Sequence, residues 1–555
     1  MSSVSADQAK PGEPGAARRP AAGIARGAAL IASLTAASRL LGLVRTLVFS
    51  QTVGASCLGT AYTTANQVPN LIYELALGGA LTCAMIPVLA RSAERAHADP
   101  AAKARVAQIT SALFTWTVII LVPLTAAIAA AAGPIASLLN PANPNAQCAH
   151  TDMTNSTATM IVVFAPQVIL YGFSVTLFGL LQAYRRFTGP ALAPIVASCV
   201  LIGSYLLFVP LDKGLPLSRT PLAAVLVLAI GSTANIAALV VVALLPAWRL
   251  RLRLRPALRF PPGVARQSGG LALVGLVEFL ASDLSTIVVI DLANGRGETG
   301  ALVLFNYSWL VFYAVYAVLA LSVTTSAFPV LSARDGQDFD RACAGSTRAV
   351  LLLSWLGTAV LAAIAVSAAQ VLASRTDQVP ELIGAFAMFA PGIVGVAVIT
   401  NLSRVMFALG RLKVAAAALA GNWLVVIVAD LLLAGLAPPH LVVGALALGN
   451  TIGQIAVAIP LVIATRRIRG AAALAGVGRA NLAGLAAAAA GVAVGVTVSV
   501  ALPGTGKLTD AASGAVAAVA AIAAFGLVAY LLDPADLGAI TRWLRRNWVR
   551  PVAGS

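Results

Sequence analysis

The chain has 555 residues, of which 59% are hydrophobic and only 10% charged, and its formal net charge is +17. Soluble globular domains carry about 25% charged residues, so this composition excludes a soluble protein and predicts an all-α polytopic membrane protein. The basic residues sit in short loops between apolar stretches. That distribution is typical of membrane topology signals and contact with anionic lipid headgroups, and it argues against nucleic-acid binding.

Residues 1–26 are rich in Ala, Gly and Pro and are predicted to be a disordered cytoplasmic tail. Apolar stretches long enough to cross a bilayer as helices, about 20 residues each, then follow one another to residue 533. Pro69 and Pro87 in the second stretch and Pro391 in the tenth predict kinks. The fourteen predicted spans are 27–54, 57–90, 106–133, 153–183, 190–211, 220–247, 267–293, 299–332, 345–373, 379–409, 412–436, 440–465, 480–502 and 510–532.

The distribution of Lys and Arg supports this count. Thirty of the 37 lie in the tail and on one set of alternating loops, five lie on the opposite set, and Arg39 and Arg45 lie inside the first span. Cytoplasmic loops are enriched in Lys and Arg, so the pattern predicts a multi-pass plasma-membrane protein with both termini in the cytoplasm.

A weak internal repeat predicts two lobes. Ile86-Pro87-Val88-Leu89 at the end of the second span resembles Phe328-Pro329-Val330-Leu331 at the end of the eighth, six helices later. Parallel six-helix repeats with substrate between them are a transporter arrangement. The predicted segments are an N-lobe at 27–247, a basic cytoplasmic linker at 248–266, a C-lobe at 267–468, two further helices at 480–533, and a cytoplasmic amphipathic tail at 534–555.

Ionisable residues inside spans point to function, because each costs about 2.5–3.5 kcal/mol at mid-bilayer. Arg39 and Arg45 lie six residues apart on the first helix, about 9 Å in rise and roughly 120° in azimuth, so one helix face cannot hide both from lipid. We expect them to line a water-filled cavity and bind phosphate or diphosphate bidentately. The alternatives are extension to the cytoplasmic interface or pairing with a buried acid. Asn70 and Glu74 of the second span are predicted to bind the substrate with these arginines, although Glu74 can equally be a structural counter-ion for one of them.

Three polar residues of later spans are candidates for a cation site. Asp283 in the seventh span, with Asn422 and Asp430 in the eleventh, can couple transport to an ion gradient, or each can simply pair with a buried donor or face water. No catalytic or nucleotide-binding motif is present, so we expect neither an enzyme nor a bound cofactor or metal. Five scattered cysteines form no redox motif. Cys57 and Cys148 can both lie at the external face and pair, but free thiols are the favoured interpretation.

Several sequence blocks resemble the MurJ (MviN) family of lipid II flippases, in the form typical of actinobacterial members. The likeness covers roughly residues 27–470 and is carried by the runs Ser38-Arg39-Leu40-Leu41-Gly42-Leu43-Val44-Arg45, Val68-Pro69-Asn70-Leu71, Gly78-Gly79-Ala80, Gln182-Ala183-Tyr184-Arg185-Arg186-Phe187 and Asn306-Tyr307-Ser308-Trp309-Leu310. The resemblance implies a fold of the multidrug/oligosaccharidyl-lipid/polysaccharide exporter superfamily. It also implies alternating access that moves undecaprenyl-diphosphate muropeptide, lipid II, to the external leaflet for peptidoglycan and cell-wall synthesis.

By this resemblance Arg39 and Arg45 match two functional arginines of the family, but four other positions depart from it. Thr46 and Thr60 replace acids, and Tyr73 and Trp309 replace arginines found in some members. These departures leave open whether the chain transports with reduced activity or transports another polyprenyl-linked glycan.

The partners expected are a lipid-linked anionic substrate, membrane lipids and the cell-wall synthesis machinery, with an ion or the membrane potential as the energy source. Two alternatives to a lipid II flippase stay open. One is an exporter of another polyprenyl-linked glycan or of drugs, although a drug exporter would place acids rather than arginines in its cavity. The other is a transport-inactive scaffold of cell-wall assembly, which has little reason to keep two arginines deep in a helix.

Overall fold

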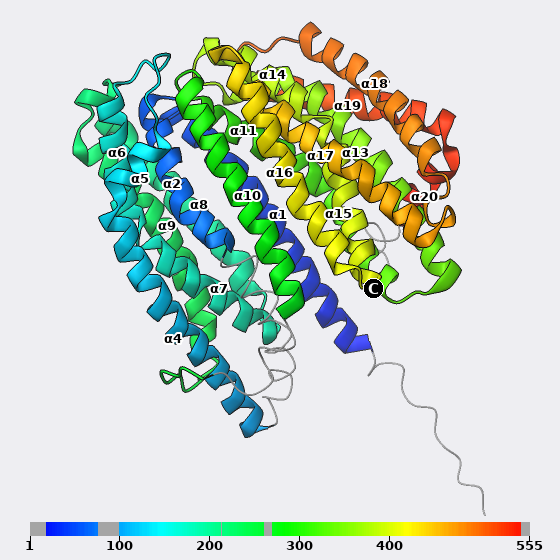
Figure 1. Ribbon diagram of the computed structural model, residues 1–555, viewed down its shortest axis with the longest axis horizontal. Coiled ribbons are helices and arrows are strands. Elements are labelled where there is room, and N and C mark those ends of the chain that lie inside the picture. Colours follow the sequence, from blue (N-terminus) through cyan, green and yellow to red (C-terminus); the bar gives the residue numbers. More distant parts are fainter. Residues whose placement is uncertain (1–17, 76–98, 213, 260–268, 545–555) are drawn as a thin grey trace, which may run out of the picture.

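The computed structural model describes residues 18–75, 99–212, 214–259 and 269–544, and these ranges contain helices and no strand (Figure 1). The first helices are α1 (Arg18–Thr52), α2 (Cys57–Leu75), α4 (Pro100–Ala130), α5 (Ala132–Leu139), α6 (His150–Phe164), α7 (Gln167–Ala183), α8 (Thr188–Asp212) and α9 (Leu222–Trp248). After these come α10 (Gly269–Arg296), α11 (Ala301–Tyr316), α12 (Ser322–Ser332), α13 (Gly336–Leu372), α14 (Val379–Phe389), α15 (Gly392–Ala408), α16 (Leu412–Leu436) and α17 (Val442–Arg469). The last are α18 (Val477–Ala501), α19 (Lys507–Leu532) and α20 (Pro534–Leu544).

The predicted all-α polytopic class is confirmed. Among the described residues, eleven helical segments are long and apolar enough to cross a membrane. The other three predicted spans coincide with α1, α2 and α10. Residues 76–98, which include Pro87 and the end of the second predicted span, lie outside the described residues. Helix α1 begins at Arg18, inside the segment predicted to be a disordered tail, because its Ala, Leu and Arg residues favour helix.

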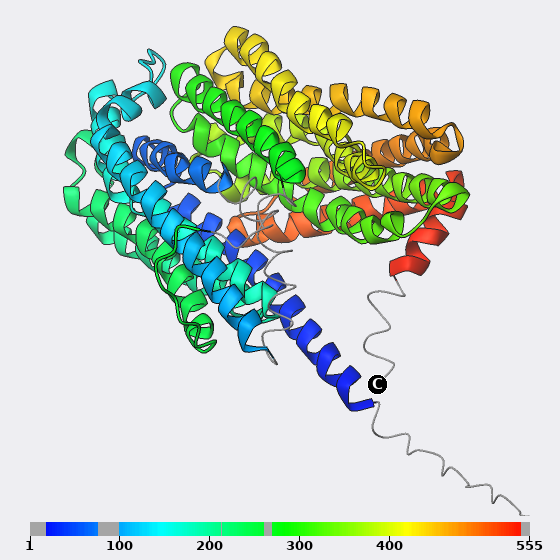
Figure 2. The same cartoon turned by 60° about the horizontal axis from the view of Figure 1, so that its bottom comes forward.

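The helices form two groups. Helices α1, α2 and α4–α9 pack mainly among themselves and form the N-lobe, whereas α10–α17 form the C-lobe. Figure 2 shows the two groups side by side. Helices α18 and α19 pack on α13, at the edge of the C-lobe in Figure 1. This grouping agrees with the predicted arrangement of two six-helix lobes and two further helices. The residue boundaries predicted for each segment stay predictions.

A broken helix occurs at the same place in each lobe. The fourth span consists of α6 and α7, with the break between them at Phe164-Ala165-Pro166. The tenth consists of α14 and α15, with the break at Phe389-Ala390-Pro391. Proline has no N–H to continue the helical hydrogen bonds, which explains both breaks. The kink predicted at Pro391 is thus confirmed, while the one at Pro166 was not predicted. Both breaks support the internal repeat.

Close helix contacts in the C-lobe depend on glycine. A Cβ at Gly395 of α15 would lie 2.6 Å from the backbone carbonyl carbon of Gln454 in α17. No side chain fits in that space without separating the two helices. Small residues permit such backbone approach between membrane helices, where van der Waals packing drives association.

Candidate functional site

A polar cavity of about 460 Å³ lies between the N-lobe helices and α11 of the C-lobe. Its walls come from α1, α2, α7, α8, α9 and α11. The polar residues that line it are Arg45, Thr46, Tyr62, Thr63, Asn66, Gln67, Asn70, Tyr73, Tyr171, Ser198, Tyr205, Ser232, Asn235, Asn306 and Tyr307. Because both lobes supply its walls, a movement of one lobe against the other changes the shape of this cavity.

The polar groups of the cavity wall suit an anion. Arg45 is the one charged residue among the described residues that line it, and the other polar groups are amides and hydroxyls. A guanidinium offers five N–H donors in a fixed fork that matches phosphate oxygens, and neutral donors around it can complete the shell. No carboxylate in the described lining competes for the arginine.

Hydrogen bonds within the wall orient its amides. Tyr171 Oη donates to Asn70 Oδ1 at 3.0 Å, and Ser232 Oγ donates to Asn66 Oδ1 at 3.3 Å. The ring of Tyr73 lies 4.2 Å from that of Tyr171. Because the oxygens of both amides accept these bonds, their Nδ2 groups are left as donors for another partner.

Aromatic residues close the cavity toward the end where α1 meets α2. Phe49 lies 5.5 Å from Tyr62, 5.1 Å from Tyr205 and 6.4 Å from Tyr307 between ring centroids. The hydroxyls of Tyr62 and Tyr205 are hydrogen-bonded at 3.2 Å. These four residues are largely buried. They separate the cavity around Arg45 from the loops at this end of the molecule.

The other residues predicted to bind substrate lie outside the cavity wall. Arg39 is exposed, six residues before Arg45 on α1, which is about 9 Å along the helix. Glu74 is exposed on α2 and lies close enough to Asp283 of α10 to interact electrostatically with it. Of the four, the structure places Arg45 and Asn70 together in the cavity. A substrate role for Arg39 and Glu74 stays a prediction.

The three residues predicted to form a cation site do not converge. Asn422 and Asp430 lie eight residues apart on α16, about 12 Å along the helix, too far for one ion to contact both directly. Asp283 lies on a different helix, near Glu74. Both Asp430 and Asp283 are buried, and their carboxylate oxygens have no hydrogen-bond partner among the described residues. Their part in ion coupling stays a prediction.

A disulfide corrects the expectation of free thiols. Cys57 at the start of α2 and Cys148 in the loop before α6 are bonded, with their Cα atoms 5.9 Å apart. This pair is the alternative to free thiols considered above, and a sequence separation of 91 residues gives no local signal of the contact. The fold brings them together because α2 packs directly on α6.

Next to the disulfide, the loop of residues 140–149 docks on the junction between α10 and α11. Asn143 Nδ2 donates to the carbonyl oxygens of Asn294 and Gly297, both at 2.8 Å. The amide N–H of Gln147 donates to Thr299 Oγ1 at 2.9 Å. These bonds join an N-lobe loop to the C-lobe, so we call residues 140–149 the latch loop.

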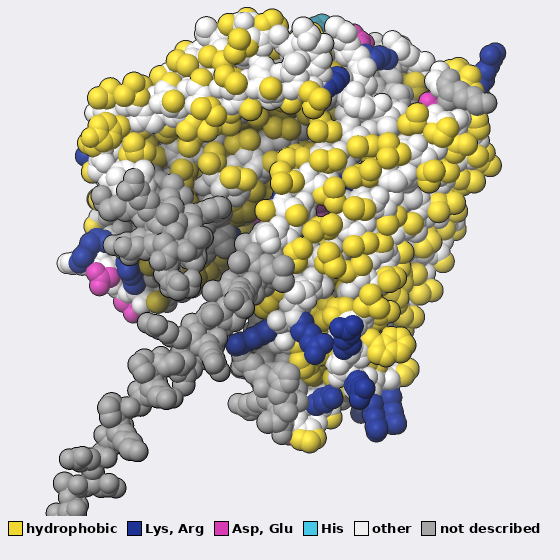
Figure 3. Space-filling model, turned by 180° about the vertical axis from the view of Figure 1, so that it is seen from behind, with side chains coloured by type: hydrophobic (Ala, Val, Ile, Leu, Met, Phe, Trp, Pro, Cys, Tyr) yellow, Lys and Arg dark blue, Asp and Glu magenta, His cyan; other side chains and the backbone are white. Residues whose placement is uncertain are grey.

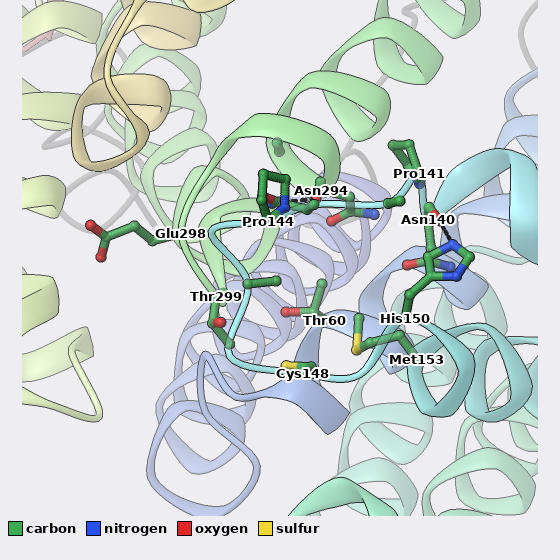
Figure 4. A pocket seen from close by; sticks show the side chains of 15 residues that line it. Thr60, Asn140, Pro141, Pro144, Cys148, His150, Met153, Asn294, Glu298 and Thr299 are labelled. Atoms are coloured by element: carbon green, nitrogen blue, oxygen red, sulfur yellow. Dashed lines mark hydrogen bonds between the residues drawn. The ribbon is translucent and has the colours of Figure 1, made fainter.

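Further contacts close the same end. Gln378 Nε2 of the C-lobe donates to the carbonyl oxygen of Ala55 at 3.0 Å. Figure 4 shows the remaining pocket, about 350 Å³, with Asn140 and His150 on one side, Thr299 on the opposite side and Glu298 pointing away. The lobes therefore meet at the disulfide end, on the far side of the aromatic residues from Arg45.

Most cavity residues were not predicted, although α2 carries a signal for them. Tyr62, Asn66, Asn70 and Tyr73 recur at intervals of four, four and three residues, which places them on one helix face. A polar face inside an otherwise apolar span indicates a water-filled cavity. Tyr73, at a position where the family resemblance places an arginine, lines this cavity, whereas Trp309 packs 5.9 Å from Phe389 in the C-lobe.

Two helical lobes with a polar cavity between them define a polytopic α-helical membrane protein. Within that class, the sequence model of the lipid II flippase MurJ matches residues 49–509. The chain belongs to the MurJ family. The match begins after Arg39 and Arg45, so it does not itself cover these two residues.

Individual relatives agree with this assignment. A lipid II flippase MurJ of Burkholderia cenocepacia is 25% identical over 302 residues, which are 54% of this chain and 56% of that protein. A probable lipid II flippase MurJ of Rhizobium meliloti is 25% identical over 31% of each chain. The matched part thus spans about half of the first relative and less of the second.

Solved structures show the same fold. A lipid II flippase MurJ in an inward closed conformation has a TM-score of 0.69 at 14% identity, covering 90% of this chain and 98% of that one. An inward-facing multidrug resistance MATE family transporter has a TM-score of 0.60 at 14% identity, covering 78% and 95%.

Proposed function

We propose that this protein moves lipid II, the diphosphate-linked precursor of peptidoglycan, across the plasma membrane. The observation that carries the proposal is the cavity between the lobes, in which Arg45 lies among neutral amide and hydroxyl donors. A diphosphate needs such a set of donors once it leaves water. Membership of the MurJ family supports a lipid-linked cargo, whose polyprenyl tail would remain in the bilayer throughout.

The direction of transport follows from a proposed topology. Disulfides persist in oxidising compartments, which supports an external location for Cys57 and Cys148. The basic loops at the opposite end then face the cytoplasm, together with both termini. In this orientation the latch loop closes the external side, and the cavity receives its substrate from the inner leaflet.

Transport then requires the external contacts to break while the lobes close on the cytoplasmic side. The contacts of the latch loop are few and polar, and hydrogen bonds of this kind contribute about 0.5–1.5 kcal/mol each. A closure of that strength is reversible on the timescale of a transport cycle. The bound diphosphate favours the state that places donors from both lobes around it.

The proposal is tested by depleting the protein in its native cell and measuring how much lipid II an external lipid II-degrading toxin can reach. We expect accessibility to fall on depletion and to return with the wild-type protein but not with Arg45→Ala. Arg411→Ala, an exposed arginine at a loop outside the cavity, is the matched control and should restore accessibility fully. Unchanged accessibility on depletion would exclude lipid II as the main cargo.

A second cargo class is favoured by one observation. The cavity wall presents the neighbouring rings of Tyr73 and Tyr171, whose planes are tilted by 33° to each other. Aromatic faces pack well against the apolar faces of sugar rings, so this wall also suits another polyprenyl-diphosphate-linked glycan. If depletion leaves lipid II accessible but traps a different lipid-linked glycan inside, the protein is an exporter of that glycan.

A further inference from the structure

An apolar groove on the N-lobe ends at an arginine. Its volume is about 550 Å³, and α4, α7, α9 and the segment directly after α9 supply its walls. The rings of Phe114 and Phe173, 5.6 Å apart, lie in its lining, together with the exposed side chains of Val118 and Leu244. Arg255 is the one charged residue in the described lining.

The segment of residues 249–259, which we call the arginine ribbon, follows α9 without forming a helix. Arg and Leu alternate along it. Leu250 is buried in the core of the N-lobe and Leu252 packs against the same core. Leu254 lines the groove. The arginines Arg249, Arg251, Arg253, Arg255 and Arg259 are all exposed. Leu250 and Leu252 therefore attach the ribbon to the lobe while the charges face outward.

Hydrogen bonds fix the ribbon along α4. The amide N–H of Arg255 donates to Ser111 Oγ at 3.0 Å, and that of Ala257 donates to Thr115 Oγ1 at 3.1 Å. Trp116 Nε1 donates to the carbonyl oxygen of Leu258 at 3.1 Å. Backbone N–H groups and a carbonyl are paired in this way over a short stretch, so the arginines keep a defined position beside the groove.

The length of α4 places the ribbon at the membrane surface. This helix has 31 residues and ends at Ala130, toward the disulfide end. The hydrocarbon core of a bilayer takes about 20 helical residues, so the opposite boundary falls near residue 110 of α4. Arg255 is held at Ser111, at the level of the lipid headgroups. Figure 3 shows Lys and Arg side chains gathered at the lower end, below a wide hydrophobic surface.

Within the described ranges, no acidic side chain neutralises these arginines. None of them forms an ion pair with a residue in the described ranges. An apolar groove that ends at unpaired arginines, at headgroup depth, matches an amphiphile with acyl chains and an anionic head. We propose that the groove and the arginine ribbon bind an anionic phospholipid of the adjacent leaflet, with its phosphate on Arg253 and Arg255 and an acyl chain along Phe114 and Phe173.

The site lies apart from the Arg45 cavity and does not depend on the transported cargo. It is tested with the purified full-length protein in detergent, titrated with phosphatidylglycerol or phosphatidylcholine while native mass spectrometry counts the bound lipids. We expect phosphatidylglycerol to bind more tightly, by about five-fold for each arginine that meets the headgroup. The variant R249Q/R251Q/R253Q/R255Q should lose this preference.

Two controls separate this site from a general positive surface. R334Q/R411Q/K413Q/R467Q neutralises four exposed basic residues elsewhere and should keep the preference. Val118→Trp fills the groove without changing charge and should weaken binding of phosphatidylglycerol. Equal losses in both four-site variants, or a preference that survives in the ribbon variant, would overturn the site. Undiminished binding to Val118→Trp would overturn the placement of the acyl chain.

Discussion

Replacing Asn143 by alanine should open the disulfide end of the molecule. The change removes two hydrogen bonds of 2.8 Å from the latch loop to the carbonyl oxygens of Asn294 and Gly297. At about 0.5–1.5 kcal/mol each, their loss costs the closed state roughly 1–3 kcal/mol. Since about 1.4 kcal/mol is a factor of ten, the ratio of open to closed molecules should rise by about five-fold to more than a hundred-fold.

The opening can be measured by double electron–electron resonance, which gives the distance between spin labels on the two lobes. Cysteines introduced at the exposed positions Ser218 and His440 report the separation at this end, after Cys199 and Cys343 are replaced by alanine. We expect one distance population in the parent and an added longer one in Asn143→Ala.

Two further variants control this experiment. Asn145→Ala changes a neighbouring exposed side chain that forms no hydrogen bond with the described residues of the C-lobe, and it should match the parent. Asn143→Asp keeps the acceptor for the Asn145 N–H but loses both donors, so it should open at least as far as the alanine variant. A latch role is refuted if Asn143→Ala leaves the distances unchanged, or if Asn145→Ala lengthens them equally.

Two predictions concern stability. Replacing both Cys57 and Cys148 by serine should lower the free energy of unfolding by about 2–5 kcal/mol, because the disulfide restrains the unfolded chain. The midpoint of thermal unfolding in detergent should fall, and reductant should lower the wild-type midpoint similarly. A midpoint that responds to neither change would contradict the predicted effect. Gly395→Ala should cost about 1–3 kcal/mol, since its Cβ meets the backbone of Gln454, whereas Gly384→Ala, with open space around it, should be neutral in the same thermal assay. Equal midpoints for these two alanine variants would refute the close-packing argument.

The spans could be predicted from the sequence because hydropathy and loop charge report directly on the membrane. The predictions for Arg45 and Asn70 rested on a polar group inside an apolar helix, and both residues line the cavity. Its tyrosines come from α2, α7, α8 and α11, and a single sequence does not show which faces of distant helices meet. Arg39 is exposed on the same helix and lies outside this lining, because depth along a helix does not define the direction of a side chain; its role in substrate binding stays a prediction.

The disulfide and the latch loop were harder to predict for a related reason. Cys57 and Cys148 lie on elements separated by a whole span, and only the packing of α2 on α6 brings them together. Asn143 lies in a loop whose composition resembles any exposed turn. Its donors acquire a role because the C-lobe presents two backbone carbonyls opposite them, and that relation between lobes has no local sequence signal.

The most direct test of the proposed function is transport of lipid II by the purified protein in liposomes, measured as the fraction that becomes accessible on the opposite leaflet over time. We expect the wild-type protein to accelerate transfer over protein-free liposomes, Arg45→Ala to abolish most of this acceleration, and Arg45→Lys to retain only part of it, because lysine cannot bind the diphosphate bidentately. Wild-type transfer no faster than in protein-free liposomes, or full activity of Arg45→Ala, would contradict a flippase that holds its substrate in this cavity.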